Sequence, residues 1–79
     1  MSPTVFREKG YRFFFFSREE KRMHVHVECE DGEAKFWLDP DIILARSHGL
    51  SKKQETAILK ILKERKDDIT KAWEKHFRC

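Results

Sequence analysis

The stretch from residue 22 to residue 28, Arg-Met-His-Val-His-Val-Glu, constrains the fold more than any other part of the chain. Met23, Val25 and Val27 are apolar, and the residues between them are polar or ionisable. Because successive side chains of a strand point to opposite faces, this period of two predicts a β-strand with one buried face. The opposite face carries the other four side chains, Arg22, His24, His26 and Glu28.

A second strand is expected directly after the first. Asp31-Gly32 is a strong two-residue hairpin signal, because both central positions of such a turn favour positive φ. Residues 33–38 then return with the same alternation and end at Asp39-Pro40, where proline lacks the N–H of a ladder. One face of this strand holds Ala34, Phe36 and Leu38, and the other holds Glu33, Lys35 and Trp37.

The N-terminal part also favours strands. Residues 4–7 form a short candidate strand, and the aromatic residues in 11–17 favour another. The run Phe13-Phe14-Phe15-Phe16 places two phenylalanines on each face. Strands are therefore expected within about residues 4–38, followed by a connector over 39–50. In this connector, residues 42–46 form one more short strand or a turn of helix, and Ser47-His48-Gly49 ends that segment.

The last third of the chain has helical periodicity. Ser51 is a good N-cap, with Gln54 at the capping-box position. A stripe of apolar residues follows at helical spacing: Ile58, Ile61, Leu62, Ile69, Ala72, Trp73 and Phe77. We predict one long helix over about residues 51–77, bent near residues 66–68, with two helices meeting there as the alternative.

These elements predict a single α+β domain over residues 1–79. An antiparallel meander sheet of three to four strands is packed on one face by the long C-terminal helix. A chain of 79 residues supplies only about 3–5 kcal/mol of stability from one core.

The other sheet face is expected to be an open surface rich in aromatic and histidine side chains, since one helix covers only one face. The predicted binding surface consists of Phe14, Phe16, His24, His26, Lys35 and Trp37. An exposed apolar patch marks an interaction surface. Three alternatives remain: the N-terminal segment or the 39–50 connector folds over it, a second copy or partner protein binds it, or nucleic acid binds it.

The two histidines suggest chemistry at the same face. His24 and His26 could act as acid and base in RNA cleavage, with Arg22 and Lys35 stabilising the phosphorane. We therefore name His24, His26, Arg22 and Lys35 as catalytic candidates. No metal is expected, because a zinc site needs a third or fourth ligand that the sequence does not supply at suitable spacing.

Composition sets the remaining expectations. The net charge of +3, from 17 Lys and Arg against 14 Asp and Glu, permits nucleic-acid contact without requiring it. Two cysteines make no disulfide framework, the longest apolar run is Phe13–Phe16, and residues 1–9 lack an apolar signal segment. We expect a cytoplasmic protein without a cofactor, a membrane span or a small-molecule substrate.

Several segments resemble the small bacterial domain-of-unknown-function family four-one-sixty. They are residues 3–5, 11–16, the Met-His-Val-His-Val strand at 23–27, residues 34–38, and the helix ending at 72–77. The resemblance covers nearly the whole chain. It implies a bacterial cytoplasm and a partner encoded beside this protein, in toxin–antitoxin-like gene pairs. It carries no established catalytic residues.

We therefore expect a small accessory protein of a two-gene, toxin–antitoxin-like module, acting through contact with a cognate small protein or with itself. The alternative is a metal-independent ribonuclease toxin or RNA-binding protein that uses His24 and His26. Between these, a non-enzymatic role is favoured.

Overall fold

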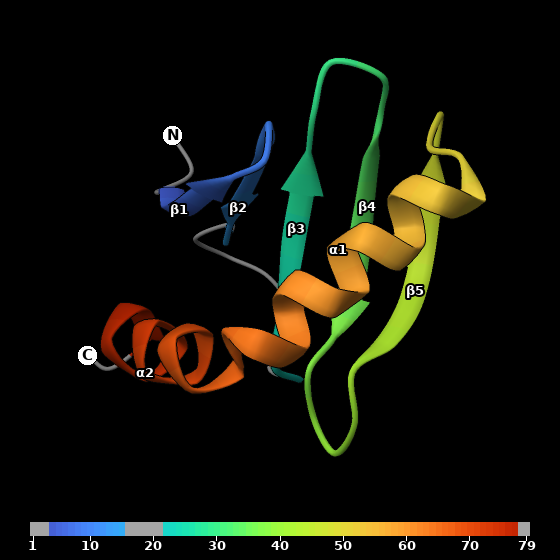
Figure 1. Cartoon of the computed structure of the whole chain (residues 1–79). Helices are drawn as coiled ribbons and strands as arrows, with labels where there is room; N and C mark the ends of the chain where they lie inside the picture. Colours follow the sequence, from blue (N-terminus) through green and yellow to red (C-terminus); the bar gives the residue numbers. More distant parts are fainter. Residues whose placement is uncertain (1–3, 16–21, 78–79) are drawn as a thin grey trace.

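A computed structural model describes residues 4–15 and 22–77. Five antiparallel strands form one sheet in chain order, and two helices follow (Figure 1). The elements are β1 (Thr4–Glu8), β2 (Tyr11–Phe14), β3 (His24–Glu28), β4 (Glu33–Trp37), β5 (Ile43–His48), α1 (Lys52–Glu64) and α2 (Lys66–Phe77). The α+β class and the antiparallel meander are confirmed.

The predicted number of strands was wrong. The connector over 39–50 contains β5, which pairs with β4 from Trp37↔Ile43 to Glu33↔His48. A register shift leaves Ala45 without a partner on β4, because Phe36 pairs with Leu44 and Lys35 with Arg46. This bulge breaks the alternation of side chains by which a strand is recognised in a sequence.

The prediction of one long helix was also wrong, and its alternative of two helices is correct. α1 ends at Glu64, and Arg65 leaves the helical region at φ −109° and ψ 18°. The Arg65 guanidinium donates to Glu8 at 2.9 Å and to Asp68 at 3.1 Å, and lies 4.0 Å from the ring centre of Phe6. Arg65 therefore ties the helix junction to β1.

The N-terminus of α1 follows the sequence prediction. The Ser51 hydroxyl accepts from the Gln54 backbone N–H at 3.1 Å, and the Gln54 side-chain oxygen accepts from the Ser51 N–H at 2.8 Å. This reciprocal pair satisfies two N–H groups that have no partner within the helix. The Gln54 amide also donates to Asp31 at 2.8 Å, which fastens α1 to the β3–β4 turn.

The core lies between the helices and one sheet face, which we call the inner face. α1 crosses in front of β3, β4 and β5 (Figure 1). Buried side chains from the sheet are Phe13, Phe15, Val25, Val27, Ala34, Phe36 and Leu38, and those from the helices are Ile58, Ile61, Leu62, Ile69 and Trp73. The predicted inner face and helical stripe are confirmed at these positions, and the side chain of Phe77 lies outside the described part.

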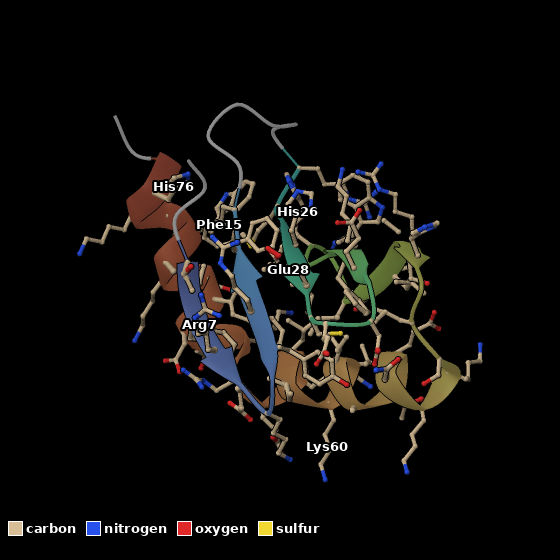
Figure 2. All side chains as sticks on the ribbon, turned by 90° about the horizontal axis from the view of Figure 1, so that it is seen from above. Arg7, Phe15, His26, Glu28, Lys60 and His76 are labelled. Carbon is tan, nitrogen blue, oxygen red and sulfur yellow. The ribbon has the colours of Figure 1, made fainter. Side chains whose placement is uncertain are left out.

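α2 packs at the end of the sheet where β2 finishes and β3 begins. Its Trp73 ring meets Phe15 edge to face at 5.3 Å between centroids, and its His76 ring lies 5.6 Å from Phe15. Figure 2 shows α2 extending from the side of α1 towards the opposite side of the sheet. The change of direction at Arg65 allows this placement.

Candidate binding groove and edge strand

The sheet face opposite α1, which we call the outer face, is defined by the strand register. Cross-strand partners share a face, so the positions of one strand fix those of the next. The outer face holds Arg12, Phe14, His24, His26, Glu28, Glu33, Lys35, Trp37, Ile43, Arg46 and His48. In Figure 2 the labelled His26 side chain points to this side, whereas Lys60 of α1 points away from the sheet on the other.

The expectation of an open aromatic surface was wrong. The exposed fractions of Phe14, His24, His26 and Lys35 are 6%, 0%, 5% and 5%. Trp37 is half-buried. The predicted binding residue Phe16 lies outside the described residues. β1 and β5 extend the two edges of the sheet and do not fold over the face, so other groups bury these side chains.

Cationic side chains cover the outer aromatic rings. The Arg12 guanidinium lies 4.4 Å from the ring centre of Phe14 and bonds Glu28 at 2.6 Å. Arg22 and Lys35 each place their charged group 4.4 Å from the ring centre of Trp37. Such cation–π contacts stabilise by about 0.5–1 kcal/mol at exposed sites and more when desolvated.

The Arg22 side chain is held in place by the backbone. Its Nε donates to the Asp39 carbonyl at 3.1 Å. Arg22 is therefore directed at Trp37, and the structure does not place it as a partner of the two histidines in catalysis.

His24 is part of the packing at the end of the sheet. Its ring lies 5.1 Å from Trp73, 5.8 Å from Trp37 and 5.2 Å from His26. Its Nδ1 is 2.7 Å from the Arg22 carbonyl, and because a carbonyl only accepts, this nitrogen carries the proton. A fully buried ring in this position cannot meet a substrate.

The outer face contains a groove of about 400 Å³ between β2 and β5. Its lining residues are Phe14, His26, Val27, Glu33, Ala34, Lys35, Arg46, Ser47 and His48. The groove brings three predicted site residues, Phe14, His26 and Lys35, together with Arg46 and His48. The lining thus holds two cationic side chains, Lys35 and Arg46, two imidazoles that can donate hydrogen bonds, and one carboxylate, Glu33. This balance of donors and charge suits an anionic group.

Arg46 and His48 were not predicted as site residues, because residues 47–49 were interpreted as the end of the 42–46 segment. A signal was present, since residues two apart on a strand share a face. Recognising β5 would have placed both side chains beside Lys35.

β5 is an edge strand with an exposed surface. Five of its six residues are exposed, and within the described chain the exposed large hydrophobic side chains are Ile43, at 48%, and Leu44, at 37%. Ile43 lies on the outer face opposite Trp37, and Leu44 lies on the inner face opposite Phe36. An edge strand presents N–H and C=O groups that can pair with another chain.

Within residues 4–15 and 22–77, no group of three or more His, Cys, Asp or Glu side chains is arranged to hold a metal ion. None of the helices in this part of the chain has the length and apolar character needed to cross a membrane.

Comparison with known proteins gives a family but no function. Residues 10–74 match the model of the family described as "Domain of unknown function (DUF4160)". This is the family four-one-sixty that the sequence resembles. Neither the curated proteins nor the solved structures contain a significant match.

Proposed function

The chain belongs to the DUF4160 family, and from its surface we propose that it is a small accessory protein that binds a partner protein along β5. In this proposal it acts in the bacterial cytoplasm as one component of a two-gene, toxin–antitoxin-like module. The partner is the protein encoded beside it, and self-association through β5 is the other form that the contact can take.

The exposure of β5 carries this proposal. The helices cover the inner face and cationic side chains cover the outer aromatic rings, so the exposed large apolar groups of the described chain are concentrated at Ile43 and Leu44. Isolated exposed apolar residues are common, but two on one unpaired edge strand combine an apolar contact with backbone hydrogen-bonding groups.

Strand addition is the contact that such an edge supports. A partner strand beside β5 would pair with its outward-facing backbone groups, and alternate side chains would meet each face. On the outer face Ile43 supplies the apolar contact, and on the inner face Leu44 does. Docking through this edge needs no opening of the buried outer face.

Size-exclusion chromatography of the protein with the product of its neighbouring gene tests the proposal. The wild type should elute as a complex, whereas Ile43→Lys should elute separately because a charge replaces the apolar contact at the edge. Ile43→Val keeps a β-branched apolar side chain and should retain the complex. A complex that forms equally well with Ile43→Lys, or no complex with the wild type and no self-association, would contradict the proposal.

The alternative function is a ribonuclease or RNA-binding protein that uses His24 and His26. The position of His26 beside Lys35, Arg46 and His48 supports contact with phosphate. The burial of His24 argues against a two-histidine mechanism, because acid and base must both reach the substrate.

Expression in a bacterial host separates the two functions. Under the accessory-protein proposal, wild type and a variant with His24→Ala and His26→Ala should leave host RNA equally intact. RNA degradation that requires the histidines, in a variant pair with equal folding by circular dichroism, would favour the ribonuclease.

A further inference from the structure

The groove and the β5 edge adjoin one another. Arg46 and His48 belong to both, since they line the groove and project from the outer face of the edge strand. A strand added to β5 would lie about 4.8 Å away, with its side chains directly opposite theirs. Every second residue of that strand would therefore stand beside the cationic end of the groove.

The charges around this position favour an acid. Arg46 pairs with Lys35 across the β4–β5 ladder, so two cations lie side by side on the outer face. His48 pairs with Glu33, which supplies the one carboxylate of the groove lining. Opposite charges on directly facing strand positions stabilise pairing, and like charges destabilise it.

The aromatic rings decide between an acidic peptide and RNA. Single-stranded RNA is recognised by stacking its bases on open aromatic or guanidinium planes. Here Arg12 lies over Phe14, and Arg22 and Lys35 lie over Trp37. The ring of His26 is also stacked with Phe14, at 5.5 Å. With these rings already covered, the groove offers charge without an open aromatic ring on which a base could stack.

We infer that β5 and the adjoining groove recognise an extended acidic segment, with carboxylates two residues apart that pair with Arg46 and His48. The inference rests on the proposed addition of a partner strand to β5. The backbone of β5 supplies general affinity, and the Arg46 guanidinium and the His48 imidazole, as hydrogen-bond donors to carboxylates, select the sequence of the segment. Lys35 adds positive potential from the groove wall.

A labelled peptide tests this inference with the intact protein. The probe is the blocked heptapeptide Thr-Val-Asp-Val-Asp-Val-Thr, in which alternate residues share a face in either strand direction. Its Kd is measured by fluorescence anisotropy beside the same peptide with Asn in place of Asp. Two carboxylate pairs should make the Asp peptide about tenfold tighter, and added salt should reduce the difference.

Three variants locate the contact. Arg46→Gln should weaken the Asp peptide about fivefold and leave the Asn peptide unchanged. Arg7→Gln is the matched control, because it removes the same charge from an exposed position of β1, at the opposite edge of the sheet. Glu33→Gln should tighten the Asp peptide about twofold, since it removes the carboxylate that competes for His48.

Several outcomes would overturn the inference: no saturable binding of the Asp peptide at millimolar concentration, equal binding of the Asp and Asn peptides, or equal effects of Arg46→Gln and Arg7→Gln. Tighter binding of a labelled oligouridylate than of the Asp peptide would assign the groove to RNA and overturn it as well. If Ile43→Lys abolishes the complex with the neighbouring protein while Arg46→Gln does not weaken it, strand addition stands and only the acidic segment is refuted.

Discussion

His24 connects the two faces of the sheet. It lies at the start of β3, where its ring contacts Trp73 of α2 and Trp37 of β4. The alternation of residues 22–28 placed His24 on the outer face correctly, but the sequence could not show that α2 reaches it. His24 therefore occupies a polar position of the alternating strand pattern and is nevertheless part of the packed interior.

The cations over the outer rings were equally hidden from sequence reasoning. Arg22 and Lys35 were predicted as polar positions on the outer face. Whether a long cationic side chain turns over a neighbouring ring depends on its rotamer, and residue spacing does not encode the rotamer. The face therefore looked open in the sequence although its apolar surface is largely covered.

The two tryptophans should differ in their contribution to stability. Trp73→Ala should lower the free energy of unfolding by about 3–5 kcal/mol, because it empties a buried site against Phe15 and His24. Trp37→Ala should lower it less, because Trp37 is half-exposed. Thermal melts of both variants measure this difference, and equal destabilisation would show that the outer face is a second core.

The ionisation of the Tyr11 hydroxyl in alkaline solution should report how β2 is packed. Burial, followed by the charges of Cys29 and Asp31, raises the pKa of Tyr11 above its ordinary value of 10.0. The folded state thus holds this proton more tightly than the unfolded state does. The resulting stability is present below about pH 10 and is lost as the pH rises through the folded pKa.

Ultraviolet titration of this single tyrosine gives its midpoint directly. The midpoint should lie above that of the urea-unfolded chain, and Tyr11→Phe should reduce the loss of stability at high pH. Coincident midpoints in the folded and unfolded protein would contradict the described environment of Tyr11.

Among the strands and helices, the sequence identified those with regular periodicity. β3, β4 and the start of α1 follow from alternation and the capping box, whereas the positive φ predicted for Asp31 and Gly32 is absent. β5 was only one of two alternatives for residues 42–46, because its side chains are mostly exposed and its register shifts at Ala45. The break at Arg65 was left as an alternative, since no proline or glycine marks it and its ties to Glu8 and Phe6 are long-range contacts.

The end of β5 is fixed by a close approach of two turns. Gly32, in the β3–β4 turn, lies against the His48 carbonyl, and a Cβ at Gly49 would lie 2.5 Å from the Asp31 carbonyl. Gly49 also has a φ of +81°, which residues other than glycine rarely adopt. These glycines hold β5 beside the β3–β4 turn and so position His48.

Gly32→Ala should displace this end of β5. A methyl group there clashes with backbone atoms, so we expect destabilisation of about 1–3 kcal/mol and weaker partner binding. Urea unfolding measures the first effect and co-elution with the partner the second. Gly10→Ala is the comparison: no atom lies within 4 Å of a Cβ there, so its cost comes from the φ of +85° alone, whereas Gly32 has no positive φ and its cost comes from the clash alone. A Gly32→Ala variant as stable as the wild type would contradict the described turn contact.

Of the two edge strands in the described part of the molecule, β5 is the one with exposed large apolar side chains. The helices cover the inner face and long cations cover the outer rings, so the exposed Ile43 and Leu44 stand out on β5. The family model matches residues 10–74, and its description names no activity. The arrangement favours a protein that acts by docking.

Hydrogen exchange of the β5 amides, with and without the neighbouring gene product, tests docking at this edge most directly. Outward-facing amides of an unpaired edge strand exchange readily, and pairing with an added strand protects them. We expect the partner to slow exchange within residues 43–48 of the wild type and to leave exchange in Ile43→Lys unchanged. Binding that protects β1 or the exposed side of α1, while β5 exchanges as fast as in the protein alone, would contradict the account.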